Sequence, residues 1–400
     1  MQIHVLDYQT TTAAWMNVEQ MREALVTRRS GLRPNDLDGS DVDTWIGRVP
    51  EIDATGLGKW SSRNNALARV CLRQGGFEDA IAKVQHHFGD TRVGLILGSS
   101  TSSIDRTEQA YRHLDAEGQL TADFSQDVVH NPGALCLFVA NYLGIRGPSQ
   151  LINTACSSSA KVFASASRWL QAGVVDAVLV GGCDALGLSV VHGFDALQLV
   201  SAKPCRPLDR ERDGINIGEA AGFALLTLSP LEDLCTGIVL EGYGESSDAY
   251  HMSHPHPEGQ GAREAMVAAL DRAHLNPQSI GYINLHGTSS RVNDTIEAKV
   301  VASLLPNTVC SSTKGWTGHT LGAAGITEAI IAFDALKTGI LPVNLNLETI
   351  DPEITISVVE RDSYDKPGHV MTNSFGFGGN NCSLIFGLGS TDSEGSETHI

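Results

Sequence analysis

The segment GPSQLINTACSSSAKVFASASRWLQAG spans residues 147–173. Its pattern predicts a turn, a short strand from Gln150, a bend at Cys156 and a helix that ends near Gly173. A thiol at a helix N-terminus faces unpaired backbone N–H groups, which favour the thiolate and lower the pKa of cysteine. The alanines and serines after Cys156 would let this helix pack deep inside a sheet sandwich. The segment therefore predicts a reactive cysteine rather than a buried structural thiol.

Short apolar runs and helical patterns alternate on both sides of this segment. Strands are predicted at 93–97, 178–180, 221–228 and 238–242, and helices at 64–74, 157–172, 261–273 and 325–337. A boundary near Pro230 divides the chain into an N-terminal half, 1–230, and a C-terminal half, 231–389. Residues 390–400 are polar and acidic, which predicts a disordered tail. The alternation indicates an α/β fold.

Composition narrows the class of protein. The chain has 400 residues, of which 42% are hydrophobic and 18% charged, enough apolar material for a large core. Its net charge of −18 argues against nonspecific binding to nucleic acid or to an anionic membrane. No apolar run approaches the roughly 18 residues that span a bilayer, so membrane insertion is not expected. The eight cysteines form no CxxC pair and no metal-ligand spacing, which favours a reducing cytoplasm and no metal.

Three later segments carry further candidate groups. YINLHGTSSRVNDTIEAKVV, residues 282–301, places His286 at the end of an apolar strand. SSTKGWTGHTLGAAG, residues 311–325, places Lys314 and His319 in a loop broken by glycine. NSFGFGGNNCSLIFG, residues 373–387, has a glycine-rich turn before a strand, whereas a phosphate-binding loop would be followed by a helix.

These segments, together with CRPLDRERDGINIGEAAG at residues 205–222, resemble the β-ketoacyl-[acyl-carrier-protein] synthases of the elongating Cys-His-His type. The resemblance covers roughly residues 90–389 and keeps the family's motif order and spacing. It implies a duplicated thiolase-like fold, a five-layered αβαβα sandwich that works as a dimer. The half 1–230 would carry the nucleophile, and the half 231–389 the two histidines.

The resemblance also implies roles for single residues. Cys156 would accept an acyl group, while His286 and His319 would donate hydrogen bonds to the thioester carbonyl of a malonyl extender. Lys314 and Glu297 would form a supporting ion pair.

The same comparison implies how substrate would be held. Thr288 and Ser290 would line a tunnel for the pantetheine arm, and Phe375 and Phe377 would line the acyl pocket, with Phe377 as its gate. The backbone N–H groups of Phe377 and Cys156 would form an oxyanion hole. Because the condensation consumes no redox cofactor or nucleotide, the phosphopantetheine arm of the carrier protein is the only prosthetic group implied.

An acyl carrier protein is the expected partner, and its acidity requires a locally basic docking surface. The segment 59–73 supplies Lys59, Arg63, Arg69 and Arg73 without an acidic residue. Its alternative role is a solvated helix face. If the segment is not the docking surface, the next candidates are Lys203, Arg206 and Arg210.

Other members of the fold fit less well. A biosynthetic thiolase would place a second cysteine in the last glycine loop, and an initiating synthase would use Cys-His-Asn. A non-catalytic chain-length-factor subunit would typically lack the nucleophile. The sequence leaves open the acyl-chain length, fatty acid or polyketide and polyene synthesis, and a homodimer or a heterodimer with such a subunit.

Overall fold

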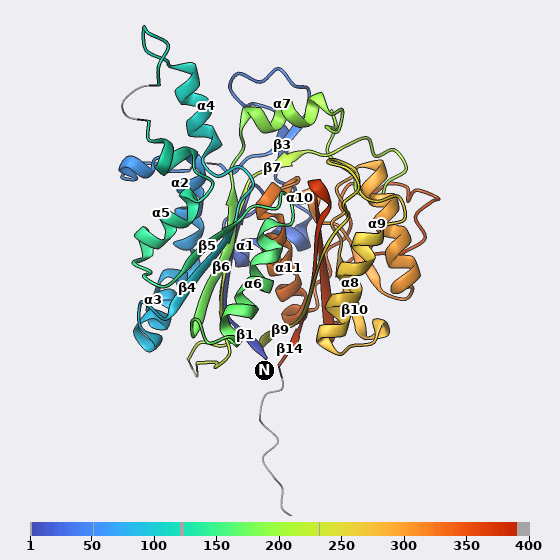
Figure 1. Ribbon diagram of the computed structural model, residues 1–400. Coiled ribbons are helices and arrows are strands. Elements are labelled where there is room, and N and C mark those ends of the chain that lie inside the picture. The colour runs from blue at the N-terminus through green and yellow to red at the C-terminus, as the bar shows by residue number, and fades with distance from the viewer. Residues whose placement is uncertain (1, 51, 121–123, 232, 390–400) are drawn as a thin grey trace, which may run out of the picture.

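The computed structural model describes residues 2–50, 52–120, 124–231 and 233–389 (Figure 1). Its N-terminal half is built on five strands of one sheet. Their order across the sheet is β1 (Ile3–Thr12), β8 (Ala220–Thr227), β6 (Ala177–Asp184), β4 (Val93–Gly98) and β5 (Ser149–Ile152). The pairs β1·β8 and β8·β6 are antiparallel, and β6·β4 and β4·β5 are parallel.

The C-terminal half repeats this arrangement. Its order is β9 (Ile238–Ser247), β14 (Asn380–Leu388), β13 (His369–Gly376), β10 (Ile280–Asn284) and β11 (Val309–Ser311), with a short β12 (Ser357–Val358) added at the edge. The first two pairs are again antiparallel and the next two parallel. The matching strand order and direction reveal the internal duplication that the family resemblance implied.

The two half-sheets meet where β1 pairs with β9, so that one sheet of eleven strands runs through the described residues. Helices form three layers, one between the two half-sheets and one on the outer face of each (Figure 1). The outer layer of the N-terminal half contains α2 (Arg63–Leu72), α3 (Phe77–Phe88) and α5 (Ala134–Leu143). The middle layer contains α6 (Ser158–Gln171) and α11 (Ala324–Thr338). The outer layer of the C-terminal half contains α8 (Gln260–Ala273) and α9 (Arg291–Leu304). The αβαβα sandwich is confirmed.

The remaining elements cap one end of the sandwich or fill its sides. They are the helices α1 (Val18–Thr27), α4 (Ile104–Arg112), α7 (Leu188–Ala196) and α10 (Lys314–Thr317), and a small sheet of β2 (Leu32–Pro34), β3 (Trp45–Gly47) and β7 (Ile217–Gly218). None of the helices in the described ranges is long and apolar enough to cross a membrane.

Glycine allows the middle helix α6 to lie close to strand β4 and to the other middle helix, α11. A Cβ atom at Gly98 would lie 2.4 Å from the backbone nitrogen of Ser159, and one at Gly325 would lie 2.4 Å from that of Ala160. Around them, the rings of Phe163, Phe333 and Phe386 pack edge to face. The helix that follows Cys156 is therefore fixed between the two half-sheets.

The predicted elements are confirmed, with β6 and β9 several residues longer than expected and the ends of the others shifted by one or two residues. The helix expected at 157–172 is α6, and the one at 325–337 is α11. The strand expected at 178–180 extends over 177–184 because the glycines 181 and 182 continue it next to β4 and β8. The predicted disordered tail, 390–400, lies outside the described residues.

Candidate active site

Cys156 lies in a tight connection between β5 and α6. The preceding residue, Ala155, has a φ of 53°, a left-handed conformation that is costly for a residue with a side chain. The serines that follow stabilise the bend, since Ser158 Oγ donates to Ala155 O (2.6 Å) and Ser157 Oγ to Thr154 O (2.9 Å). The bend and the start of the helix place the thiol at the helix N-terminus, as the sequence predicted.

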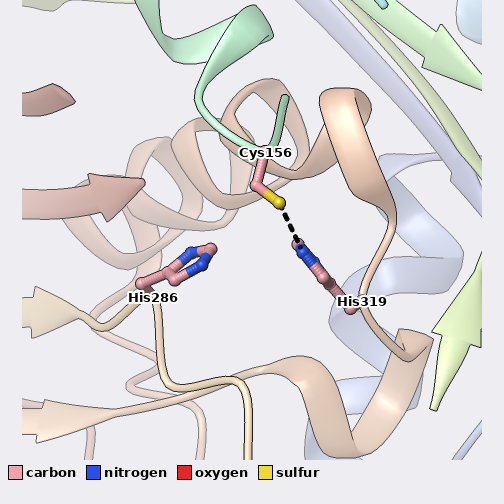
Figure 2. Close-up of side chains that lie close together, drawn as sticks. All are labelled: Cys156, His286 and His319. Atoms are coloured by element: carbon pink, nitrogen blue, oxygen red, sulfur yellow. Dashed lines mark hydrogen bonds between the residues drawn. The ribbon is translucent and has the colours of Figure 1, made fainter. Parts of the chain in front are cut away.

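His319 faces this thiol from the other half of the molecule. Its Nε2 lies 2.9 Å from Cys156 Sγ, within hydrogen-bond distance (Figure 2). The backbone of His319 is held on both sides, because its N–H donates to Asn216 O and its C=O accepts from Gly218 N. The motif at 205–222 therefore positions this histidine.

His286 comes to the same point from the end of β10. Its ring lies 5.4 Å from that of His319, at an angle of 85°, and points toward Cys156 (Figure 2). The N–H groups of His286 and Gly287 each donate to Glu297 of α9, at 2.9 Å. Cys156, His286 and His319 are all at least 95% buried. The structure thus brings together the three residues that the sequence singled out.

The predicted ion pair between Lys314 and Glu297 is wrong. Lys314 Nζ instead donates to Glu328 Oε1 of α11 and to the backbone carbonyl of His286, both at 2.5 Å. Glu297 is occupied by the N–H groups of the His286 loop and by Asn373 Nδ2. The middle helix α11 brings Glu328 to the lysine, a contact that spacing along the chain does not reveal.

The predicted lowering of the Cys156 pKa is also wrong. Burial raises the pKa of this thiol to about 11, although the charge of Lys314 and the backbone N–H groups of Phe377 and Cys156 act in the opposite direction. A helix N-terminus lowers the pKa of a thiol, but the removal of water from the buried sulfur of Cys156 raises it by more. The thiol is therefore protonated at neutral pH.

The neighbouring imidazoles are neutral. Burial, with the positive charge of Lys314 beside them, lowers the pKa values of both His286 and His319 well below 6.5. A neutral His319 in contact with the thiol can accept its proton. Burial also raises the pKa values of Glu297 and Glu328 to about 7.

A cavity of about 260 Å³ leads from the surface to these groups. The four residues predicted to bind substrate, Thr288, Ser290, Phe375 and Phe377, all line it. The ring of Phe377 lies 5.4 Å from that of Phe194 on α7, which also lines the cavity. Its lining is mostly apolar away from the catalytic groups.

Asp184 is a supporting residue that the sequence analysis missed. It ends β6, is fully buried, and accepts hydrogen bonds from Ser99 Oγ (2.5 Å), from the backbone and side chains of Ser100 and Thr101, and from Gly322 N (2.6 Å). It thereby ties the end of β4 to the loop that carries His319. The sequence feature that could have identified Asp184 is its place as the acidic last residue of an otherwise apolar strand.

The predicted docking segment is only partly a free basic surface. Arg63 forms an ion pair with the buried Glu219 and donates to Val49 O, and Arg69 is buried against the carbonyls of Asp53 and Thr55. Lys59 and Arg73 are exposed. Charge along the sequence did not distinguish surface arginines from those that pair inside the fold, so Arg63 and Arg69 are structural residues.

Two family models match the chain in succession. Residues 63–230 match the N-terminal domain of beta-ketoacyl synthases, and residues 238–348 match the C-terminal domain. The 3-oxoacyl-[acyl-carrier-protein] synthase 2 of Staphylococcus aureus is 33% identical over 325 residues, which cover 77% of this chain and 80% of that protein. The protein of the same name from Vibrio cholerae is 33% identical over 314 residues, 74% of this chain and 75% of that one.

Solved structures agree with these matches. A ketosynthase in complex with its chain length factor from Xenorhabdus doucetiae is 36% identical, covers 97% of this chain and 98% of the matched chain, and has a TM-score of 0.86. A beta-ketoacyl synthase from Burkholderia phymatum is 25% identical over 97% of this chain and 100% of that one, with a TM-score of 0.87. With its duplicated fold, its Cys-His-His cluster and these relatives, the chain belongs to the β-ketoacyl synthase family.

Proposed function

We propose that this protein is a β-ketoacyl-[acyl-carrier-protein] synthase. It would hold an acyl chain on Cys156 and extend it by decarboxylative condensation with a malonyl thioester on an acyl carrier protein. The contact between Cys156 Sγ and His319 Nε2, with His286 facing both at the base of the cavity, carries this proposal.

In the first half-reaction, the sulfur of Cys156 attacks the incoming acyl thioester. Because the thiol is protonated at neutral pH, its proton must leave, and the neutral His319 is placed to accept it. The backbone N–H groups of Phe377 and Cys156 both approach the sulfur and would stabilise the negative oxygen of the tetrahedral intermediate. Loss of one such donor costs about 2.7–4 kcal/mol in comparable acyl-transfer sites. The proton leaves with the carrier thiol.

In the second half-reaction, the malonyl thioester loses carbon dioxide and negative charge develops on its carbonyl oxygen. Two neutral imidazoles, His286 and His319, can donate N–H hydrogen bonds to this oxygen. Lys314, which donates to the backbone carbonyl of His286, holds a positive charge behind them. The carbanion then attacks the Cys156 thioester, which forms the carbon–carbon bond and releases the cysteine sulfur. The released thiolate then takes up a proton from water, which restores the Cys156 thiol.

Thr288 and Ser290 support a role for the cavity in binding the pantetheine arm. Their hydroxyl groups lie 3.0 Å apart and both residues line the cavity, where they could bind the amides of the arm. Arg291 also lines it and is exposed. We propose that the carrier docks at this opening, with Arg291 and the exposed Lys203 meeting its acidic surface.

We further propose that the active unit is a dimer. Strand β5 is the edge of the sheet, and its first residues, Ser149 and Gln150, are exposed, so its outer backbone groups are open to pairing with another chain. The partner would be a second copy or a chain length factor, as in the solved relative from Xenorhabdus doucetiae. A purely non-catalytic role of this chain is disfavoured by the intact Cys156, His286 and His319.

Intact-protein mass spectrometry with a panel of acyl-carrier thioesters tests the assignment. We expect one acyl group per active chain, located on the peptide that contains Cys156, and a longer product after malonyl carrier is added. The Cys156→Ala variant should take up none. An acyl group on another cysteine, or acylation without any extended product, would exclude the proposed reaction.

A further inference from the structure

The loop between β9 and α8 carries three histidines close together, in the sequence DAYHMSHPH at residues 248–256. Both ends of this loop are fixed. Asp248 N donates to Gly379 O, and Asp248 Oδ2 accepts from His256 N, each at 2.9 Å. In the middle, Met252 O accepts from Gly378 N at 2.8 Å. The loop is therefore attached to the glycine-rich turn that carries Phe377.

Three polar atoms converge within this loop. His251 Nδ1 and His254 Nδ1 lie 3.1 Å apart, and Ser253 Oγ lies 3.0 Å from the His254 nitrogen and 3.4 Å from the His251 nitrogen. The two rings are 4.8 Å apart and tilted by 69°. Both histidines are exposed, so nothing in the core forces their nitrogens to face each other.

These separations match adjacent ligand positions around one metal ion. Zinc binds imidazole nitrogen at about 2.0–2.1 Å, and two ligands at that distance with angles between about 90° and 109° lie roughly 2.9–3.4 Å apart. His251 Nδ1 also accepts a long hydrogen bond, 3.2 Å, from Ser253 N, so the lone pair of this nitrogen points into the loop. A neutral imidazole can keep its single proton on Nε2, so the lone pair of His251 Nδ1 could bind the ion in place of this long hydrogen bond.

We propose that His251 and His254, assisted by Ser253 Oγ, bind a divalent transition-metal ion such as Zn²⁺, Co²⁺ or Ni²⁺. Imidazole is a preferred ligand of these ions, whereas Mg²⁺ and Ca²⁺ take oxygen ligands. Because both rings are exposed, water can occupy the remaining coordination positions. His256 is outside the site, since its ring packs near Tyr250 and, among the described residues, its ring nitrogens do not come within ligand distance of both His251 and His254.

The position of the site connects it with the catalytic cavity. Ser253 and His254 line the cavity that contains Cys156. An ion bound there would lie at its opening and stiffen the loop that bonds to Gly378. This site is separate from the Cys156, His286 and His319 cluster, whose side chains could also attract a metal.

Metal binding by the full chain tests the proposal, with Co²⁺ as the probe and Mg²⁺ in excess. The measurements use a Cys156→Ala/Cys235→Ser background, which removes the catalytic thiol and the exposed one. Equilibrium dialysis should give one Co²⁺ per chain. His251→Gln and His254→Gln should each weaken binding at least about tenfold, since even the loss of a residue that only orients a ligand typically costs 10–100-fold.

His256→Gln is the matched control from the same loop, and its affinity should stay within about twofold of the parent. No saturable binding in the background protein would overturn the proposal. So would equal weakening by His256→Gln, or full affinity in His254→Gln. Thermal unfolding without metal should give the same midpoint for all three variants, because none of the three substituted side chains is buried.

Discussion

The two halves of the molecule share one topology but end their corresponding strands differently. In the N-terminal half, β5 passes to α6 through the short bend at Cys156. In the C-terminal half, the equivalent passage from β11 to α11 is longer and carries Lys314 and His319. The end of β4 has hydroxyl residues bound to Asp184, whereas the end of β10 has His286 bound by Glu297. The same scaffold thus holds a nucleophile in one half and proton-donating groups in the other.

The largest expected effect separates the contributions of the two histidines to the two half-reactions. His286→Ala should retain most self-acylation but lose about 10²–10⁴-fold in malonyl decarboxylation, since only the enolate oxygen needs this imidazole. His319→Ala should keep measurable self-acylation, slowed because the thiol loses its hydrogen-bond partner. Single-turnover acylation and carbon dioxide release measure the two steps. Normal decarboxylation in both variants would refute the division of roles.

The second-largest expected effect concerns the stability that the ion pair between Lys314 and Glu328 provides. Lys314→Met leaves the buried Glu328 without its partner and should cost about 3–5 kcal/mol in the free energy of unfolding. The double variant Lys314→Met/Glu328→Gln should recover part of this loss while remaining poorly active, because the positive charge beside His286 and Cys156 is still missing. Urea unfolding of both proteins measures the difference. If the Lys314→Met variant is as stable as the unmodified protein, the ion pair between Lys314 and Glu328 does not stabilise the fold.

The protonation of Cys156 should appear in its reaction with a neutral alkylating agent. With a pKa of about 11, the thiolate fraction and the alkylation rate should rise about tenfold per pH unit, so about 100-fold from pH 7 to pH 9. Peptide mass spectrometry at the Cys156 peptide follows the rate without interference from other thiols. A plateau below pH 8 would instead mean that the helix N-terminus outweighs burial and that the cysteine is ionised at neutral pH.

The smallest expected effect is a difference in unfolding free energy between variants of Asp184, in the N-terminal half, and Glu297, in the C-terminal half. Asp184→Asn and Glu297→Gln each replace an acceptor oxygen with an amide that faces buried donors, so each should cost about 1–3 kcal/mol in unfolding free energy. Asp184→Asn should be the more harmful, because more donors converge on Asp184. Glu297→Gln should affect decarboxylation more than acylation, since it holds the His286 loop. The reverse order of stability would assign the central supporting role to the C-terminal half.

Local patterns predicted the parts of the site that depend on neighbours in sequence. The bend at Cys156, the strand end at His286 and the glycine-broken loop at His319 each lie within one short segment. The extent of α6 and α11 could be read from periodicity for the same reason. The strand β1 was not predicted, although its pairing with both β8 and β9 gives it a central place in the sheet.

The predictions that were wrong depended on which residues the fold brings together. Glu328 reaches Lys314 only because α11 lies in the middle layer, and Arg63 turns inward because Glu219 lies beneath it. The pKa of Cys156 reflects the water removed by packing, a quantity that the order of residues does not give. Buried charge and desolvation are properties of the assembled layers.

The central place of β1 has a consequence for synthesis on the ribosome. Thr12 pairs with Ala220, and His4 with both Thr227 and Val239. At roughly 5–20 residues per second, on the order of ten to forty seconds pass between translation of this strand and translation of its partners. During that time its apolar residues, such as Val5 and Leu6, have no sheet to join. Strand β1 therefore waits for its partners until β8 and β9 have been made, and a chaperone bound to it would shield its apolar residues until then.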